Sequence, residues 1–587
     1  MEQKIDEVFK ETKVKKHKHT FLKIFIVLFI LCVLIGGAIF ALKFGPNYIN
    51  RDITDRTNLV INYTNVTGKM KQEMIIEDDI VYLSLNDIMN YYDKHIYYDN
   101  QYNQIVTTSE TKVGVLKLNE NKITINGVSK KINGKAFVKN DIYYLPISEM
   151  EDVYNIKVMK ADNKIIIESL DKKLTTGVAS KNIKIKSKTT MFSRTVEKVS
   201  KDENVVIAET EDNSLKQGWI KVRTQNGNLG YVEEKEIKDK KVEREQLVLE
   251  KQIEGKISLA WDYFSEFGKA PDNTDVKYDG VNVVSPSFLY LKLKDTKQEK
   301  PSTIDLASQA RVIDNIGEEG EAYINWAHSN NYKVWAKFSN ETLTTTIDEF
   351  SYIINDYKLR EIMIKDILNY VDKFGLDGIN LDFEYMYQND KDAFSKFVIE
   401  LAPQLRAKGK CLSVDVTAPN GGENWSLCYD RNTLGEVADY IVFMGYDQYG
   451  TTTIGTTSGY NWVENSLNSM FKYDEVPSDK IILGLPFYTK LWQTKEDKTI
   501  KGTVVPMKNI QNSIPQNASK EWKEDLKQYY IQYEQGEYVY KMWIEDNESF
   551  KEKLELVNKY NLAGAGYWRK GFEDDGIWSI IKESLNL

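Results

Sequence analysis

The stretch that decides the fold is Gly378-Ile379-Asn380-Leu381-Asp382-Phe383-Glu384, in which apolar and polar residues alternate. In a strand, alternate side chains share a face. The apolar side chains would face a layer of helices, and the amide and two carboxylates would face the other way. Because buried carboxylates are costly unless they are paired or functional, the pattern predicts a strand with a polar working face that ends at Glu384. A satisfied structural polar network is the alternative.

Seven further apolar runs have the length of strands. They begin at Lys256, Val281, Tyr332, Cys411, Tyr440, Ile481 and Ala563. Amphipathic segments, such as the helical pattern that starts at Lys358, separate them. Eight β-then-α units over residues 253–587 predict an α/β (TIM) barrel, in which functional residues lie at the carboxyl ends of the strands.

These motifs resemble those of the family 18 glycoside hydrolases, whose signature reads DxxDxDxE. Asp377, Asp382 and Glu384 match three of its four acids, and Asn380 replaces the second Asp. Such Asn variants resemble the branch of the family that acts on bacterial cell walls and spores. Further matches are Met444-Gly445-Tyr446-Asp447, Gly484-Leu485-Pro486-Phe487-Tyr488 and Trp568; the third strand departs from the family's S-x-G-G with Lys337-Phe338-Ser339-Asn340.

The resemblance implies a retaining, substrate-assisted mechanism, which is an exception to the usual pair of carboxylates. Glu384 would protonate the leaving oxygen, and the substrate's own 2-acetamido group would attack the anomeric carbon. Asp382 would orient that acetamide and raise the pKa of Glu384, and Tyr446 would bind the carbonyl oxygen.

The implied substrate-binding residues extend beyond this catalytic group. They are Trp568, Met444, Asp447, Asn380 and Asp377. Five more tryptophans are either sugar platforms or core residues: Trp261, Trp326, Trp425, Trp462 and Trp492.

Composition excludes several other classes of protein. A net charge of −9 disfavours a nucleic-acid partner. Three cysteines cannot build a disulfide framework or a four-cysteine zinc site, and of the four histidines only the two in the basic tail have metal-ligand spacing. We therefore expect no metal and no cofactor, with Cys411 buried and Cys428 in a loop.

Residues 24–42 form an uncharged, mostly apolar run that is long enough to cross a bilayer. A cleaved signal peptide is the alternative, but the run is long for one and its nearest cleavage site, around residues 39–41, is poor. Six lysines precede the run closely, so the positive-inside rule predicts that residues 1–23 are a cytoplasmic basic tail. We expect a single-pass membrane protein with its catalytic domain outside.

Two smaller parts precede the barrel. Residues 57–170 contain an α+β repeat with an offset of 62 residues, starting at Asp78 and Asn140, and resemble the copper amine oxidase N-terminal domain. The name implies no copper here, and the expected role is a spacer or a wall contact. Residues 180–239 predict a small all-β barrel that resembles bacterial Src-homology-3-like domains, with Asn226-Gly227 as a hairpin turn. Residues 238–251 read as a linker or a connecting helix.

The combination predicts an endo-acting hydrolase of N-acetylglucosamine linkages in peptidoglycan, with a plausible place in spore cortex or sporulation. A chitinase acting on chitin oligomers uses the same chemistry. A catalytically silent wall-glycan lectin is the third reading, and the presence of Glu384 argues against it.

Overall fold

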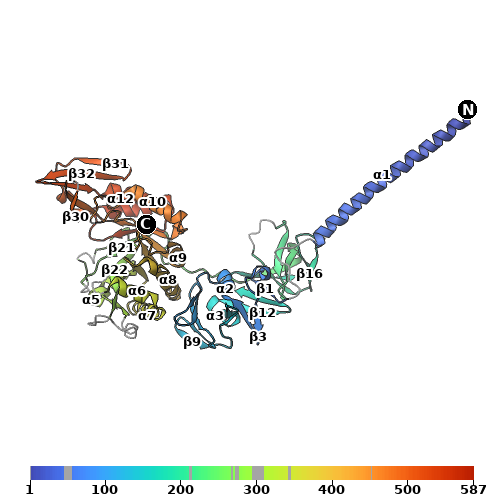
Figure 1. Cartoon of the computed structure of the whole chain (residues 1–587), viewed down its shortest axis with the longest axis horizontal. Coiled ribbons are helices and arrows are strands. Elements are labelled where there is room, and N and C mark those ends of the chain that lie inside the picture. Colours follow the sequence, from blue (N-terminus) through green and yellow to red (C-terminus); the bar gives the residue numbers. More distant parts are fainter. Residues whose placement is uncertain are drawn as a thin grey trace. The chain divides into compact units, whose positions relative to one another are not determined.

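A computed structural model describes residues 2–44, 56–209, 215–265, 269–271, 276–293, 310–340, 345–450, 452–496 and 498–587 (Figure 1). The chain forms two compact units. Unit 1 comprises Met1–Lys94, Leu118–Lys122 and Lys131–Leu249, and unit 2 comprises His95–Lys117, Ile123–Lys130 and Glu250–Leu587.

All eight predicted strands form a closed parallel barrel in unit 2, which confirms the predicted fold. They are β21 (Ile257–Asp262), β22 (Val283–Leu293), β24 (Lys333–Ser339), β25 (Gly378–Asp382), β26 (Cys411–Val416), β27 (Tyr440–Met444), β28 (Ile481–Pro486) and β34 (Gly564–Trp568). The ring closes where β21 pairs with both β34 and β22. A further strand, β23 (Ala310–Asp314), pairs antiparallel with the outer part of β22.

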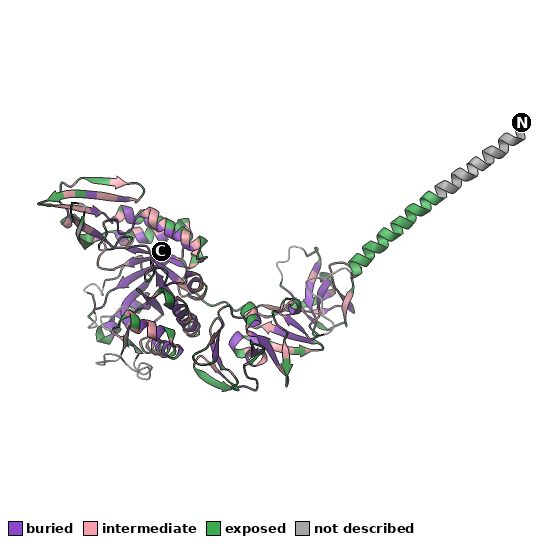
Figure 2. Cartoon of the chain, viewed as in Figure 1, coloured by how far each residue is buried: buried purple, intermediate pink, exposed green. Residues whose placement is uncertain are grey.

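Helices cover the outside of the barrel, and the strands between them are buried (Figure 2). They are α5 (Gly317–Ser329), α6 (Ile347–Asn355), α7 (Tyr357–Phe374), α8 (Lys391–Arg406), α9 (Arg431–Val437), α10 (Tyr460–Lys472), α12 (Asn547–Lys559) and α13 (Ile577–Leu585). Asp356 caps the start of α7 by accepting from the Leu359 N–H, and Gly375 ends it in the left-handed conformation. The predicted apolar face of β25, Ile379, Leu381 and Phe383, is fully buried in the core that includes these helices.

An antiparallel sheet that the eight-run pattern did not include is inserted between β28 and α12. Its strands are β29 (Tyr488–Lys495), β30 (Lys498–Pro506), β31 (Lys520–Lys523), β32 (Gln528–Gln535) and β33 (Tyr538–Trp543), with the short helix α11 (Ile510–Ser513) among them.

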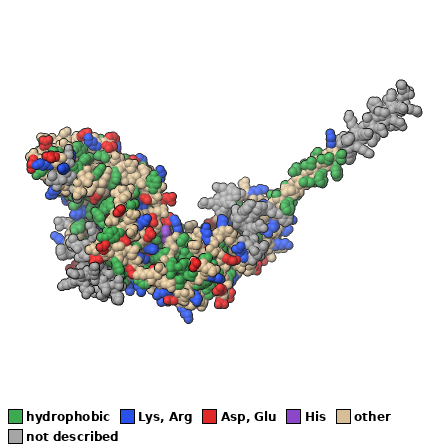
Figure 3. Space-filling view, viewed as in Figure 1, with side chains coloured by type: hydrophobic (Ala, Val, Ile, Leu, Met, Phe, Trp, Pro, Cys, Tyr) green, Lys and Arg blue, Asp and Glu red, His purple; other side chains and the backbone are tan. Residues whose placement is uncertain are grey.

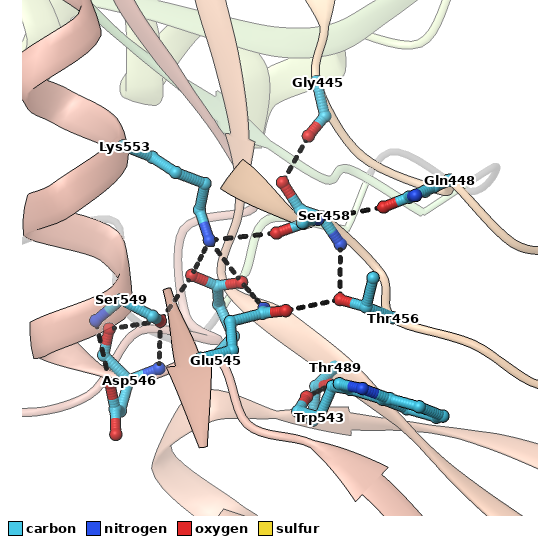
Figure 4. A network of polar contacts seen from close by, with 12 residues as sticks. Gly445, Gln448, Thr456, Ser458, Thr489, Trp543, Glu545, Asp546, Ser549 and Lys553 are labelled. Carbon is cyan, nitrogen blue, oxygen red and sulfur yellow. Dashed lines mark hydrogen bonds and ion pairs between the residues drawn. The ribbon is translucent and has the colours of Figure 1, made fainter. Parts of the chain in front are cut away.

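A buried polar network joins this sheet, through Gln528 of β32, to the loop after β27 (Figure 4). Lys553 and Glu545 form a fully buried ion pair of 2.7 Å. The Lys553 ammonium also donates to the Ser458 carbonyl at 3.1 Å, and the Ser458 hydroxyl donates to the Gly445 carbonyl at 2.5 Å. Because Gly445 directly precedes Tyr446, the network fixes the loop that carries the predicted site residues Tyr446 and Asp447.

The predicted repeat is confirmed element by element. The first copy runs β4 (Ile80–Ser84), α2 (Leu85–Tyr91), β5 (Tyr97–Asp99) and β6 (Gln104–Thr108). The second runs β11 (Ile142–Pro146), α3 (Glu151–Tyr154), β12 (Ile156–Ala161) and β13 (Lys164–Ser169). The two first strands, β4 and β11, pair antiparallel with each other. The remaining strands of unit 1 within residues 57–170 are β1 (Asn58–Ile61), β2 (Thr64–Asn65), β3 (Ile75–Glu77) and β10 (Phe137–Lys139).

A five-stranded meander, β5 to β9, has most of its residues in unit 2 and packs on barrel helices α7 and α8. It adds β7 (Val113–Lys117), β8 (Lys122–Ile125) and β9 (Val128–Lys131) to β5 and β6. Tyr97 donates to the Glu400 carboxylate at 2.6 Å and accepts from Arg360 at 3.2 Å. Arg360 and Glu400 form a buried ion pair of 2.9 Å. The predicted limits of the stalk and barrel remain predictions.

Unit 1 also contains a seven-stranded antiparallel sheet. Its strands are β14 (Leu174–Ala179), β15 (Ile183–Lys186), β16 (Thr195–Val199), β17 (Asn204–Ile207), β18 (Trp219–Arg223), β19 (Leu229–Glu233) and β20 (Ile237–Arg244). The predicted turn at Asn226-Gly227 is confirmed, since β18 pairs with β19 and Gly227 has φ of 73°. The first half of the segment read as a linker or helix, residues 238–244, is instead part of strand β20, which pairs with β14. The likeness to Src-homology-3-like domains stays a prediction.

The helix α1 (Glu2–Phe44) contains the predicted apolar segment. Leu22–Lys43 has a mean hydropathy of 3.1 and is long and apolar enough to cross a membrane, as either a signal sequence or an anchor. Its hydrophobic side chains are exposed along the helix (Figure 3). Met1 and the side chains of residues 2–21, which carry most of the predicted basic tail, lie outside the described residues.

Candidate active site

A cavity of about 170 Å³ opens at the carboxyl ends of the barrel strands. Its lining residues are Asp382, Glu384, Asp415, Trp425, Met444, Tyr446, Asp447 and Trp568. Six of these eight are predicted site residues, and they come from β25, β27, β34 and the residues that follow these strands. The alternation read from residues 378–384 therefore brings the expected acids to the expected end of the barrel.

Asp382 ends β25 with its carboxylate almost completely buried. One oxygen, Oδ2, accepts from the Lys337 ammonium at 2.5 Å. The other, Oδ1, is buried and has no hydrogen-bond partner among the described residues. A buried carboxylate oxygen without a donor is costly, so Oδ1 is ready to receive a donor from a bound ligand.

Glu384 lies two residues beyond Asp382 in a segment whose backbone is held from two sides. The Asn340 side chain accepts from the Glu384 N–H and donates to the Glu384 carbonyl, both at 2.9 Å. The Tyr429 hydroxyl donates to the Phe383 carbonyl at 2.6 Å. Tyr385 then turns the chain through the left-handed region, with φ of 52°. These contacts fix where the Glu384 side chain leaves the backbone.

Asn380 lies deeper in the barrel and does not line the cavity. Its NH₂ group donates to Asp415 at 2.5 Å and to Ser413 at 3.1 Å, and its oxygen accepts from Trp261 at 2.7 Å. Burial and the nearby Asp382 carboxylate raise the pKa of Asp415 well above its usual value. The ionised form of Asp415 is therefore disfavoured where this side chain lines the cavity beside Asp382.

Tyr446 and Asp447 follow β27 as predicted. Burial is the main reason that the pKa of Tyr446 is raised well above its usual value, so its hydroxyl remains a donor. Asp447 accepts from the Lys490 ammonium at 2.6 Å and from the Tyr488 hydroxyl at 2.8 Å. This carboxylate is thus already paired.

Aromatic side chains complete the cavity. Trp568, at the end of β34, packs edge-to-face on Trp261 with ring centroids 5.8 Å apart. Trp425 lines the cavity and packs against Tyr385 at 5.0 Å. Of the five other tryptophans considered as platforms, Trp425 alone lines this cavity: Trp261 and Trp492 are buried, and Trp326 and Trp462 pack against the core.

Asp377 lies at the opposite, amino end of β25. Its carboxylate accepts from the Val334 N–H at 3.0 Å and contacts His328 at 2.9 Å and Lys333 at 3.3 Å. This placement does not support the predicted contact of Asp377 with substrate. The Asp377 side chain instead links the start of β25 to β24 and to His328 of α5.

The site combines an accessible acid, a buried carboxylate with one open oxygen and an apolar wall, which are typical of enzymes that hydrolyse glycosidic bonds. The described residues contain no group of three or more His, Cys, Asp or Glu side chains that could hold a metal ion. All three cysteines are free, and Cys411 and Cys428 are buried.

Comparison with known proteins agrees with this class. The profile of the glycosyl hydrolases family 18 matches residues 260–573, more than half of the chain, and the chain belongs to this family. It is therefore a chitinase-like glycosidase. The profile of the copper amine oxidase N-terminal domain matches residues 60–168.

Several proteins are similar over the barrel. The uncharacterized glycosylase YvbX of Bacillus subtilis is 24% identical over 279 residues, which cover 46% of this chain and 79% of that protein. The cortical fragment-lytic enzyme of Bacillus subtilis is 24% identical over 244 residues, 40% of this chain and 56% of that protein. A chitinase structure from Chromobacterium violaceum has a TM-score of 0.46 at 22% identity, covering 57% of this chain and 99% of that one.

Three important residues were not among the predicted ones. Asp415 could have been found by the same rule, because it stands at the polar end of an alternating strand, two residues after Ser413. Lys337 and Asn340 were visible only as a departure from the family's third-strand motif. Their partners, Asp382 and the Glu384 backbone, lie more than forty residues away in sequence and are joined to them only by the pairing of β24 with β25.

Proposed function

We propose that this chain cleaves N-acetylglucosamine linkages of peptidoglycan by a retaining, substrate-assisted mechanism. The observation that carries the proposal is the unpartnered Oδ1 of Asp382 beside Glu384. A glycosidase with its own nucleophile needs a second ionised carboxylate at the anomeric carbon. Burial and the neighbouring Asp382 disfavour the ionised form of Asp415, and Asp447 is paired with Lys490, so neither fits that role.

In the proposed reaction, Glu384 donates its proton to the glycosidic oxygen as the bond from that oxygen to C1 breaks. The acetamide oxygen attacks C1 and forms an oxazolinium ring, whose N–H is received by Asp382. Tyr446 donates to the acetamide oxygen, and Trp568 supports the sugar ring. Ionised Glu384 then takes a proton from water, which attacks C1 and opens the ring with net retention.

Peptidoglycan rather than chitin is proposed as the substrate. The family match and the likeness to a protein named cortical fragment-lytic enzyme support a bacterial wall or cortex glycan. The apolar α1 supports a retained anchor that holds the barrel outside the cell. Membrane fractions should then contain the whole 68.0 kDa chain, with the barrel open to protease added outside; a mature form starting near residue 42 in the medium would contradict the anchor.

The test is mass spectrometry of fragments released from purified walls, in parallel with chitin oligomers. We expect wall fragments with N-acetylglucosamine at the new reducing end and no release from de-N-acetylated walls, which lack the internal nucleophile. Glu384→Gln should lower turnover by about 10²–10⁴-fold, since it removes general acid catalysis, and should keep glycan binding. Rapid cleavage of de-N-acetylated glycan would refute the mechanism; cleavage of chitin alone would make the chain a chitinase, and binding without cleavage would make it a lectin.

A further inference from the structure

The residue at the centre of this inference is Lys337 on β24, which points into the barrel interior. β24 and β25 pair in parallel with Lys337 opposite Asn380 and Ser339 opposite Asp382. The Lys337 side chain is 9% exposed. A lysine is almost never buried unless it is paired, because the loss of hydration outweighs any packing gain.

The charges around Lys337 come from β25, the residues that follow it, and β26. Its ammonium lies 2.5 Å from Asp382 Oδ2, and Glu384 and Asp415 also act on it electrostatically. Together these carboxylates raise the pKa of Lys337 despite its burial. Asp382 is faced in turn by Asp415, by the Tyr446 hydroxyl and by the Tyr429 hydroxyl. Both tyrosines are held protonated, so they add no negative charge.

Asn380 stands where the family signature has its second Asp, two residues before Asp382 on the same face of β25. Position 380 carries an amide whose oxygen is used by Trp261 and Ser285 and whose NH₂ group is used by Asp415 and Ser413. Asn380 thus offers Asp382 neither a proton nor a charge. Lys337 supplies the charge from the neighbouring strand instead.

We propose that Lys337 is a positioning residue for the reaction, which keeps Asp382 ionised and occupies its Oδ2 so that Oδ1 faces the substrate's acetamide. The inference rests on the proposed function, since it assigns the acetamide to Oδ1. Asp382 then lies between two cationic groups as the oxazolinium forms, one at each oxygen. No proton has to enter or leave Asp382 during the cycle.

The consequence is a defined change in pH dependence when the charge is removed. In Lys337→Met, Asp382 loses the cation at its Oδ2, and its ionised form is disfavoured because the carboxylate is almost completely buried. The acid limb of kcat/KM on an N-acetylglucosamine oligomer should move to higher pH by about 1–3 units, the usual effect of an opposite charge at this range. Activity should be lost mainly in acid and recover toward alkaline pH. Lys337→Arg, which keeps the charge, should leave the acid limb near that of the wild type.

A matched control is available in the same barrel. Lys570 forms a pair with Asp262 at 2.8 Å that is even more buried than the pair of Lys337 and Asp382, and neither residue lines the cavity. Lys570→Met should lower stability as Lys337→Met does but leave the acid limb in place. If both variants move the limb equally, or neither does, the assignment of Lys337 is wrong.

A measurement without substrate separates this inference from the proposed function. The full chain in detergent micelles, labelled with ¹³C at the aspartate carboxyls, should show Asp382 ionised at neutral pH; Asp382→Asn identifies the signal. A protonated Asp382 at neutral pH in the wild type would overturn the inference, whether or not Lys337→Met folds. Failure of the wild type to cleave any acetylated glycan would overturn the proposed function alone.

Discussion

Asn340→Ala tests whether the position of the Glu384 backbone limits the reaction. The variant removes two hydrogen bonds of 2.9 Å, one to the Glu384 N–H and one to its carbonyl. Each is worth about 0.5–1.5 kcal/mol net, so the pair contributes about 1–3 kcal/mol to holding the acid in place. At about 1.4 kcal/mol per factor of ten in rate, kcat should fall by about 5- to 150-fold. KM should change little, because the proposed substrate contacts of Asp382 and Trp568 remain.

The barrel offers a close control for this variant. Asn282, at the amino end of β22, makes the same two-bond contact with the backbone: it accepts from the Ser258 N–H at 2.8 Å and donates to the Lys256 carbonyl at 2.9 Å. Asn282→Ala should lose comparable thermal stability and keep kcat. The assay is initial rates on a soluble N-acetylglucosamine oligomer, with thermal unfolding of both variants. A wild-type kcat in Asn340→Ala, or an equal loss in Asn282→Ala, would refute the reasoning.

Three further predictions concern stability and binding. Glu400→Gln leaves Arg360 buried and charged without its partner, which should cost about 3–5 kcal/mol and lower the midpoint of thermal unfolding; an unchanged midpoint would mean that water already reaches the pair. The pKa of Asp415 is raised in the folded state. Protonation of Asp415 therefore stabilises the folded state fully below the unfolded pKa of about 3.9, and this stabilisation is lost as the pH rises. Asp415→Asn should therefore raise the unfolding midpoint at neutral pH and not in strong acid, and calorimetry at both pH values decides this. Trp425→Ala should weaken binding of glycan by about 1–2 kcal/mol, seen in calorimetric titration as a roughly 5- to 30-fold higher Kd, whereas unchanged affinity would place the sugar elsewhere.

The sequence was sufficient for the barrel and for most of the cavity, for a physical reason. Alternation within one strand fixes which side chains face inward, and this local rule located Asp382 and Glu384 without any knowledge of their neighbours. Asp377 was predicted from the family signature and not from the alternation, and the signature gave no measure of its distance from the cavity; it lies just before β25, at the end opposite to the cavity.

Other features depended on contacts between distant residues. The inserted sheet from β29 to β33 is antiparallel and partly exposed, so it lacks the continuous apolar runs that identified the barrel strands. Lys337 is an ordinary charged residue in the sequence, and only its pairing with Asp382 across two strands shows that it belongs to the site. The first half of the segment read as a linker is part of strand β20, because β14 provides an edge with which it pairs.

The packing of the β5–β9 meander on α7 and α8 has a consequence for how such proteins can be recombined. A gene fusion that transfers residues 253–587 to another carrier would carry Arg360 and Glu400 without Tyr97, and it would strip Val106 and Val113 from the Tyr357 side of α7. The fusion protein would expose an apolar cluster that is covered in the full chain, which would favour aggregation. The unit that can be exchanged between genes is thus the barrel together with a piece of the chain that lies more than one hundred residues upstream.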